Sequence, residues 1–337
     1  MKKISVLMLL STYQKTSGHT SVVDNLSINL VKQGYDITIG ALKFEKEPPK
    51  DIKKIKLSYT NVSSYFQNYD IIHNHQTKMN YYALFSPKPF VFQYHGASTK
   101  SQRINLQISL RLCKKHIQRI ILVSKSSILQ LPKFMRSEEI LTIYNGIDTK
   151  FYSLKKDTHK EKHDPQLLFT GNLFKYKNVQ LLIQVIGKLK EIFPKIHLQV
   201  VGDGEFKINL EQFVKENDLE ENVSFLGRID NDELRKKYQI ADIYVSASTF
   251  ETFGMPLLEA MACGTPVAVS DIPAHVELVS ESGAGMYFSN NIDEAQKIIS
   301  QIYQNRIELG IKGRKFAEKL DWEYIAKEYG KLYDQFV

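Results

Sequence analysis

The sequence predicts an α/β protein made of two doubly wound parallel-sheet domains that face each other across a cleft. Three observations support this prediction. Short apolar runs alternate with amphipathic helical segments along the chain, as they do in βαβ units. A charged segment that is poor in large apolar residues, 149–165, separates two such series and is the best linker candidate. The length of 337 residues is sufficient for two domains that each bury a core.

The first 40 residues are typical of a strand, a loop, a helix and a second strand. The apolar run 3–10 is interpreted as a buried strand rather than a signal peptide, because no small-x-small cleavage site follows it. Apolar residues then recur at helical spacing over 22–30, and Gly34 is a natural end for that helix. Residues 35–42 form the next expected strand.

Several further apolar runs end at a polar residue. In open parallel sheets, site residues gather beyond the carboxyl ends of the strands, so these endings are candidates for function. In the first half of the chain they are His73, His95 and Ser124. In the second half the expected strands are 166–170, 196–201, 223–226, 243–246 and 266–270, and the expected helices are 179–193, 206–217 and 232–239.

Composition and charge narrow the class of protein. Hydrophobic residues make up 43% and charged residues 24% of the chain, as in ordinary globular proteins, and no apolar run approaches the roughly 20 residues that span a bilayer. Cys113 and Cys263 form no disulfide or metal-binding pattern, which predicts a reduced, cytoplasmic protein. The net charge is +14 over residues 1–165 and −6 over 166–337. A basic first half attracts phosphate-rich partners. An anionic membrane is one such partner; nucleic acid is another, but no nucleic-acid-binding module is recognisable in the sequence.

The segment 101–119 is expected to be a helix with two apolar rows. The first row, at helical spacing, is the predicted core face: Leu106, Leu110, Cys113 and Ile117. The second row and the cations that flank it are Ile104, Ile108, Leu112, Arg111, Lys115 and Arg119. Apolar side chains among cations suit the surface of an anionic membrane. The preferred interpretation is a helix buried on both sides, with cations that extend to solvent.

The segment 250–267, FETFGMPLLEAMACGTPV, is the strongest candidate for chemistry. Gly254 permits a tight turn, Pro256 suits the first turn of a helix, and Gly264 ends that helix. The backbone amides of residues 253–255 should therefore lie at a helix N-terminus, which is an anion site.

Two carboxylates lie beside this predicted anion site. Glu251 precedes the turn and Glu259 lies within the first turns of the helix. A carboxylate beside a phosphate site cannot serve the phosphate, but it can accept hydrogen bonds from sugar hydroxyls. The segment therefore fits a ligand that carries a diphosphate between two polyols.

The segment resembles the nucleotide-sugar motif of retaining glycosyltransferases of the two-Rossmann (GT-B) type, specifically glycosyltransferase family 4, also called glycosyl transferases group 1. The matching positions are Phe250, Glu251, Phe253, Gly254, Pro256, 259–262 and 264–267. Other similarities follow in the expected order: Val123 and Ser124, 144–148, Gly171 with Lys177, 201–204, 225–227 and 322–333. The resemblance covers nearly the whole chain and is weakest over 43–69.

The resemblance implies a domain assignment. Residues 1–155, with a C-terminal crossover helix at 321–337, would form a Rossmann-like acceptor-binding domain. Residues 156–320 would form a Rossmann-like domain that binds the nucleotide sugar.

The resemblance also implies roles for single residues. Glu251, His95 and Lys177 would be catalytic: Glu251 supports positive charge at the anomeric carbon, His95 holds an acceptor or donor hydroxyl, and Lys177 neutralises the leaving diphosphate. Glu259 would bind the ribose, and the backbone near Arg228 would face the base. The complete set of implied donor-binding residues is Gly18, Gly171, Asn172, Lys177, Gly202, Asp203, Arg228, Phe253, Gly254, Met255, Leu258 and Glu259.

Two positions depart from the family pattern. The family usually has Arg directly after the glycine that corresponds to Gly171, whereas this chain has Asn172, which replaces a charged bidentate fork by neutral donors. Lys175 or Lys177 is the candidate to compensate. Ser17 precedes Gly18 where a glycine pair is common.

The expected function is transfer of a hexosyl unit from a UDP- or GDP-linked sugar to a glycan or lipid-linked acceptor in cell-surface polysaccharide, glycolipid or glycoprotein-glycan assembly. No cofactor or metal is expected beyond the donor sugar. The main alternative, suggested by Asn172, is a non-catalytic partner that binds a sugar nucleotide or acceptor. A nicotinamide-dependent oxidoreductase ranks lower because no G-x-G-x-x-G follows the first strand. A phosphorylase or epimerase of similar fold stays open. The expected location is the cytoplasm, with attachment to the inner face of the cell membrane left open.

Overall fold

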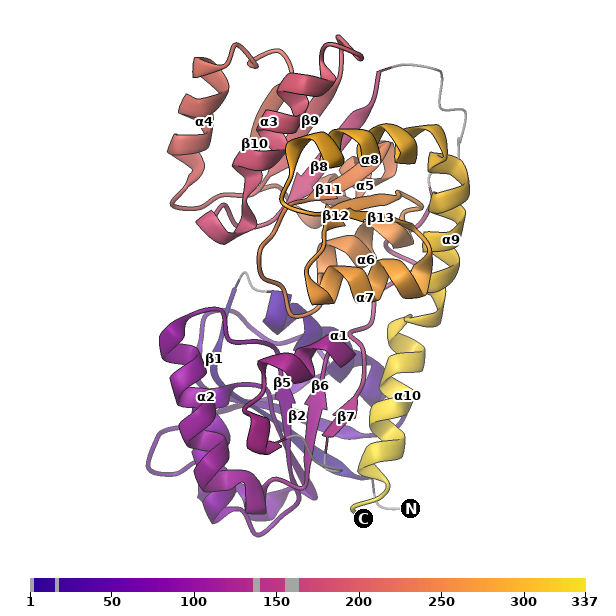
Figure 1. Cartoon of the computed structure of the whole chain (residues 1–337). Helices are drawn as coiled ribbons and strands as arrows, with labels where there is room; N and C mark the ends of the chain where they lie inside the picture. The colour runs from indigo at the N-terminus through magenta and orange to yellow at the C-terminus, as the bar shows by residue number, and fades with distance from the viewer. Residues whose placement is uncertain (1–2, 16–17, 136–139, 155–163) are drawn as a thin grey trace. The chain divides into compact units, whose positions relative to one another are not determined.

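The computed structural model describes residues 3–15, 18–135, 140–154 and 164–337. Contacts divide the chain into two compact units, Met1–Gly146 with Leu320–Val337, and Ile147–Lys319. Each unit is built on one parallel β-sheet with helices on its faces (Figure 1). The prediction of two doubly wound parallel-sheet domains is therefore confirmed.

The first unit has a seven-stranded parallel sheet in the order β3-β2-β1-β4-β5-β6-β7. Its strands are β1 Ser5–Tyr13, β2 Asp36–Phe44, β3 Lys53–Lys56, β4 Ile71–Asn74, β5 Phe90–Tyr94, β6 Arg119–Leu122 and β7 Ile140–Thr142. Its helices are α1 Gly18–Lys32, α2 Lys100–Cys113 and α10 Trp322–Tyr333, with 3₁₀ segments η1 Ser63–Asn68, η2 Thr77–Phe85, η3 Lys114–His116, η4 Lys125–Gln130 and η5 Lys133–Met135.

Alternation along β4 shows which helices cover which face of this sheet. Ile72 belongs to the core cluster that contains Leu106 and Leu110 of α2. The next residue, His73, points to the opposite face. There its Nδ1 lies 2.6 Å from the Tyr333 hydroxyl of α10. Helix α10, in yellow in Figure 1, also packs against α1, so the end of the chain completes the first unit. His73 thus lies inside a strand rather than beyond its end.

Helix α2 corrects one expectation. Its predicted core face is buried, including Leu106 and Leu110. The second apolar row is not buried, because the exposed fractions of Ile104, Ile108 and Leu112 are 47%, 49% and 58%. The preferred interpretation of a helix buried on both sides was therefore wrong. The helix packs on the sheet and on η2 through one face and leaves the other in solvent.

The second unit has a six-stranded parallel sheet in the order β10-β9-β8-β11-β12-β13. Its strands are β8 Gln166–Thr170, β9 His197–Val201, β10 Val223–Gly227, β11 Ile243–Ser246, β12 Val267–Ser270 and β13 Gly285–Phe288. Its helices are α3 Val179–Leu189, α4 Lys207–Glu216, α5 Asn231–Ile240, α6 Met255–Ala262, α7 Pro273–Ser282, α8 Ile292–Gln304 and α9 Arg306–Lys319, with the 3₁₀ turn η6 Lys175–Lys177.

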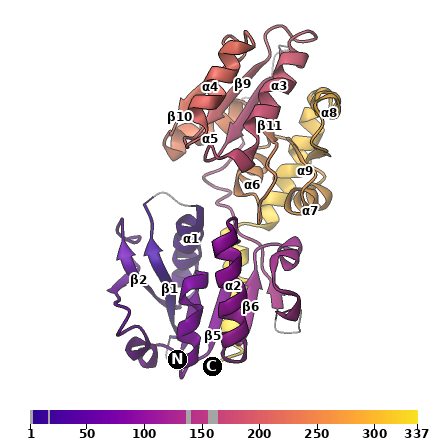
Figure 2. The same ribbon diagram turned by 60° about the vertical axis from the view of Figure 1, so that its left-hand side comes forward.

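Helices cover both faces of this second sheet. One core cluster joins α3, α4 and α8 to inward residues such as Leu198 and Val245. Val245 alternates with Tyr244, whose ring meets Tyr238 of α5 on the other face. Figure 2 shows α3 beside α4, and α9 in contact with α6 and α7. The strands end at the loops that carry most of the predicted donor-binding residues.

The contacts place the division between the units at Gly146 and Ile147, ahead of the predicted boundary at 155. The reason is that the chain packs on the second unit directly after Ile147. The Tyr152 ring lies 6.2 Å from that of Tyr238, and the Arg314 guanidinium donates to the Tyr152 carbonyl at 2.8 Å. Residues 155–163 of the predicted linker lie outside the described residues. Within the described ranges, no helix is long and apolar enough to cross a membrane.

Candidate functional site

At the ends of three neighbouring strands of the second unit lie glycines whose backbones are in contact with the next strand end. The Gly171 N–H donates to the Val201 carbonyl at 3.0 Å, and the Gly202 N–H donates to the Gly227 carbonyl at 2.8 Å. Gly202 has φ +134°, and a Cβ on it would lie 1.9 Å from the Gly171 carbonyl oxygen. Only glycine fits here, and the resulting surface is backbone that a ligand can approach closely.

The start of α6 forms the predicted helix N-terminus. Gly254 is its N-cap with φ +103°, followed by Met255 and Pro256 in the first turn. The side chains of Phe253 and Leu258 are buried in the core. Phe253 can therefore act only through its backbone. The Leu258 N–H donates to the Gly254 carbonyl at 3.4 Å. Leu258 therefore has no exposed group with which it could bind the donor.

Lys177 and Glu251 form an ion pair next to this helix start. Lys177 Nζ lies 2.5 Å from Glu251 Oε1, and the exposed fractions of the two side chains are 12% and 19%. The loops that carry them are tied together. The Thr249 N–H and hydroxyl both donate to the Tyr176 carbonyl, at 2.8 and 3.2 Å. This position therefore holds a cation and a carboxylate in direct contact.

The other predicted polar residues of the second unit lie at its surface. Asn172 and Lys175 are exposed in the loop after β8. Asp203 is exposed after β9, where its Oδ1 accepts the Gly204 N–H at 2.9 Å, and Arg228 is exposed after β10. They share the strand ends with the glycine backbones.

Glu259 is held by tyrosines that the sequence did not reveal. The Tyr238 hydroxyl donates to Glu259 Oε2 at 2.8 Å, and the Thr170 hydroxyl lies 2.8 Å from the same tyrosine oxygen. Since Tyr238 donates to the carboxylate, Thr170 is the donor to Tyr238. Burial raises the pKa of Glu259, while hydrogen bonds from Tyr238 and Tyr152 act in the opposite direction. This relay orients a carboxylate that can still accept hydrogen bonds from a ligand.

His275 is a second residue that the sequence did not reveal. It lies buried in the first turns of α7, and its Nδ1 lies 3.0 Å from the Ser270 hydroxyl oxygen. That hydroxyl donates to the Ser248 carbonyl at 2.6 Å, so the proton sits on His275 Nδ1. Nε2 is buried and has no hydrogen-bond partner within the described part of the chain. A Cβ on Gly254 would lie 3.7 Å from His275 Cδ2, so the imidazole supports the start of α6.

The first unit holds the other predicted residues, His95 and Gly18. His95 Nε2 lies 3.2 Å from Nδ1 of His75, and the ring centroids of His19 and His95 are 4.2 Å apart. Burial lowers the pKa of His19 to about 4 and that of His95 well below its ordinary value. Gly18 opens α1, with open space where a Cβ would lie. Ser17, the departure noted in this loop, lies outside the described residues.

The comparisons with known protein families fit this geometry. Residues 151–320 match the family described as Glycosyl transferases group 1, and residues 16–151 match Glycosyltransferase Family 4. The chain belongs to the glycosyl transferases group 1.

Relatives from two organisms agree with this assignment, and a solved structure shares the fold. An uncharacterized glycosyltransferase of Methanocaldococcus jannaschii is 28% identical over 64% of this chain, and the O-antigen chain mannosyltransferase of Salmonella typhimurium is 32% identical over 64%. The match spans only 59% of the length of each relative. The crystal structure of Anabaena HepE in complex with UDP and glucose superposes with a TM-score of 0.82 at 19% identity, over 98% of this chain and 99% of HepE, which shows the GT-B fold.

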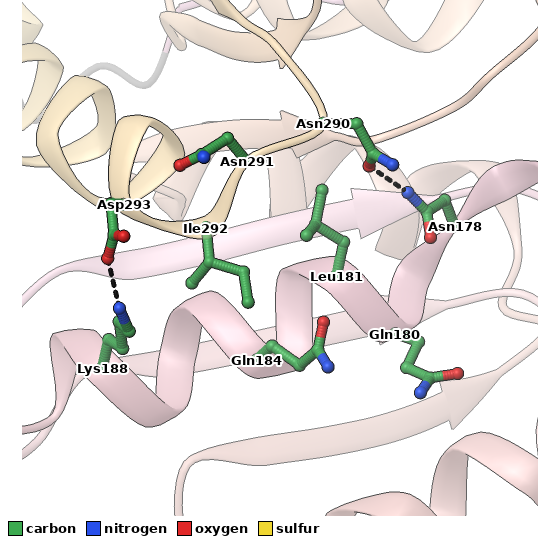
Figure 3. A pocket seen from close by; sticks show the side chains of 9 residues that line it. All are labelled: Asn178, Gln180, Leu181, Gln184, Lys188, Asn290, Asn291, Ile292 and Asp293. Carbon is green, nitrogen blue, oxygen red and sulfur yellow. Dashed lines mark hydrogen bonds and ion pairs between the residues drawn. The ribbon is translucent and has the colours of Figure 1, made fainter.

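A polar groove elsewhere on the second unit contains none of the predicted site residues. It lies between α3 and the start of α8 (Figure 3). Two side-chain bridges cross it, one from Asn178 Nδ2 to Asn290 Oδ1 at 2.8 Å and one between Lys188 and Asp293. Four of its polar side chains already bond one another in pairs and it holds none of the predicted site residues, so we assign this groove no role in the chemistry.

Proposed function

We propose that this chain is a retaining glycosyltransferase that moves a hexosyl unit from a UDP- or GDP-linked sugar to a glycan or lipid-linked acceptor. The observation that carries the proposal is the arrangement at the start of α6. A helix N-terminus lies beside the Lys177–Glu251 pair, and Glu259 lies further along the same helix. These groups suit a diphosphate between two polyols. The presence of UDP and glucose in HepE, a protein of the same fold, supports this class of donor.

In the proposed reaction, the bond between the anomeric carbon and the diphosphate oxygen breaks and its electrons leave with the nucleoside diphosphate. The acceptor oxygen bonds to the anomeric carbon on the same face, and its proton passes to the departing phosphate. Lys177 neutralises that phosphate, and Glu251 supports the positive charge at carbon. His95 holds a sugar hydroxyl. No divalent metal is needed in this scheme, since Lys177 supplies the cation.

The remaining residues bind the donor in this proposal. Glu259 accepts hydrogen bonds from the ribose hydroxyls, and its orientation by Tyr238 supports that role. The glycine backbones at the strand ends, Gly171 and Gly202, allow the donor to approach, as does Gly18. The remaining predicted donor contacts are Asn172, Asp203 and the backbones of Arg228, Phe253, Gly254 and Met255.

A panel of UDP- and GDP-sugars tests this proposal, first by thermal shift and then by release of nucleoside diphosphate in the presence of candidate acceptors. A donor that stabilises the protein and is consumed supports the transferase. A donor that stabilises the protein without turnover supports the non-catalytic partner instead, a role that the exposed, uncharged Asn172 favours. If no nucleotide or sugar nucleotide stabilises the protein, the proposed donor site is wrong.

We further propose that the chain works in the cytoplasm and binds the inner face of the cell membrane through α2, where it would meet lipid-linked acceptors. The exposed row Ile104, Ile108 and Leu112 supports this surface. The exposed ring of Phe134 lies beside it, with the charged groups of Arg111 and Lys114 at 5.9 and 5.6 Å from the ring centroid. Apolar side chains among cations are what an anionic interface attracts.

Co-sedimentation with anionic and with neutral vesicles tests the membrane proposal. We expect binding to anionic vesicles that weakens when Ile108 and Leu112 are changed to Ser. Ile208→Ser is the matched control, since Ile208 is an exposed isoleucine on α4 of the other unit. Equal, weak binding to both kinds of vesicle would rule the membrane surface out.

A further inference from the structure

Three histidines from neighbouring strand ends converge in the first unit. His19 lies in the first turn of α1 after β1, His75 directly follows β4, and His95 directly follows β5. These three strands are adjacent in the sheet. One ring nitrogen from each histidine lies within 4.8 Å of the other two, and His75 Nδ1 lies 3.2 Å from His95 Nε2.

The hydrogen bonds around the cluster leave lone pairs inside it. His75 Nε2 lies 3.3 Å from Met8 Sδ, a weak acceptor, so the proton of His75 sits on Nε2. His75 Nδ1 then accepts a hydrogen bond from His95 Nε2, whose proton a metal ion would replace. His19 Nε2 is buried and has no hydrogen-bond partner within the described residues. A buried polar nitrogen without a partner is costly unless a ligand satisfies it. His73 stacks on His75 but uses its Nδ1 on Tyr333, so it stays outside the cluster.

We propose that His19, His75 and His95 bind one transition-metal ion of the zinc class, with a water molecule as the fourth ligand. Zinc–nitrogen bonds of about 2.0–2.1 Å at tetrahedral angles put ligand nitrogens about 3.3 Å apart. The 3.2 Å between His75 and His95 already matches that spacing. The ligand nitrogen of His19, at the start of a helix, lies within 4.8 Å of the other two, so a movement of up to about 1.5 Å would complete the set.

The chemistry of the donor set selects the metal. Imidazole suits Zn²⁺, Co²⁺, Ni²⁺ and Cu²⁺, whereas Mg²⁺ and Ca²⁺ take oxygen ligands. Among the described residues, the cluster consists of histidines without a carboxylate. The site is therefore distinct from a magnesium site for the donor diphosphate.

Metal binding at these histidines should affect glycosyl transfer, and this expectation rests on the proposed function. His95 is proposed to hold a sugar hydroxyl. Its Nε2, the nitrogen that faces His75, cannot hold that hydroxyl while it is bound to a metal. Zn²⁺ should therefore inhibit the transferase rather than support it.

Cobalt titration tests the metal site without any need for activity. The protein, purified without a polyhistidine tag, is titrated with Co²⁺ and followed by visible absorption, and Zn²⁺ retained after dialysis is measured by metal analysis. We expect one ion per chain and the absorption bands of four-coordinate Co²⁺. Removing the residue that hydrogen-bonds a metal-binding side chain weakens metal affinity by about 10–100-fold. His19→Ala removes a metal-binding side chain itself, so it should weaken Co²⁺ affinity by at least this factor. His116→Ala, at an exposed histidine of the same unit, is the control and should bind as the wild type does.

The outcomes separate the two proposals. If the wild type shows no cobalt bands, or if His19→Ala binds Co²⁺ as tightly as the wild type does, the metal site is wrong. If Co²⁺ binds as expected but Zn²⁺ leaves donor turnover unchanged, the site stands and the inhibition is wrong. If the chain has no turnover at all, the titration still decides the site, while the proposed function fails on its own assay.

Discussion

Lys177 Nζ lies 2.5 Å from Glu251 Oε1, so the two side chains predicted to act on opposite sides of the bond that breaks are partners of each other. Both are mostly buried, with exposed fractions of 12% and 19%. In such a setting, removing one charge leaves the other without this partner, which costs far more than breaking an exposed pair. The pair therefore links the stability of the site to its chemistry.

The first prediction is a strong coupling between these two residues. Lys177→Met and Glu251→Gln should each lower the free energy of unfolding by about 3 kcal/mol, and the double variant should lose clearly less than the sum. Urea unfolding measures all three variants. The exposed pair of Lys327 and Glu323, 3.1 Å apart, is the control and should show a coupling below about 0.5 kcal/mol. Additive losses at Lys177 and Glu251 would contradict the pairing.

The second prediction separates the two carboxylates. Glu259→Ala should weaken donor binding by about 10–100-fold, because a carboxylate that accepts hydrogen bonds from hydroxyls contributes about 1.5–3 kcal/mol. Glu251→Ala should leave affinity closer to wild type and lower kcat by about 100-fold or more. Calorimetric titration of donor and steady-state kinetics give the two values. Donor affinity that is unchanged by Glu259→Ala would contradict the ribose assignment.

The third prediction concerns the neutral residue in the first loop of the second unit. Asn172 is exposed, so the larger side chain of Asn172→Arg is tolerated sterically. A guanidinium there can bind the diphosphate in a bidentate manner and should raise kcat about tenfold. Asn172→Gln, a longer but uncharged side chain, is the matched control and should change kcat little. A rate for Asn172→Arg at or below that of wild type would mean that Lys177 already supplies the charge that the reaction requires.

The fourth prediction tests the backbone contact between strand ends. Gly202→Ala should lower the free energy of unfolding by about 3 kcal/mol or more, because its Cβ would lie 1.9 Å from the Gly171 carbonyl oxygen and its φ of +134° is strained for alanine. Gly187→Ala in α3 is the control: the nearest atom to its Cβ would be 3.7 Å away, and alanine favours a helix by about 1 kcal/mol. A Gly202→Ala protein as stable as wild type would mean that the two loops can separate.

Local patterns in the sequence were enough to predict the fold and the centre of the site. Strands β8 and β11 begin and end where the predicted strands do, and the turn at Gly254 follows from a glycine and a proline at the right spacing. These features depend on residues that are near one another in the chain. The second apolar row of α2 was placed wrongly because periodicity shows that a row exists but not what covers it.

Contacts between distant residues could not be predicted in this way. Lys177 and Glu251 are 74 positions apart, and nothing in either segment marks the other as its partner. The same holds for Tyr238, which orients Glu259 from a different helix. The histidine cluster needs three loops that only the order of the strands brings together. His275 looked like an ordinary helix residue, since its role depends on a serine and a glycine that fold back on it.

The last prediction concerns the dependence of stability on pH at His275. Burial lowers the pKa of His275 from 6.5 to about 4, so the folded protein binds fewer protons than the unfolded chain between these values. The free energy of unfolding should therefore fall as the pH drops from about 6.5 towards 4, with a contribution from this residue of about 3 kcal/mol at the lower end. His275→Asn keeps an N–H near the position of Nδ1 but does not titrate in this range.

Thermal unfolding of the wild type and of His275→Asn at several pH values between 7 and about 4.5 measures this contribution as a difference in slope. The other buried histidines, such as His73, titrate in both proteins and cancel in the comparison. The variant should be less stable at pH 7, because the smaller side chain leaves space in the core, yet lose less stability on acidification. Parallel pH profiles would show that His275 gains its proton at the same pH in the folded protein as in the unfolded chain, and the imidazole would then not be the buried support of Gly254 that its contacts indicate.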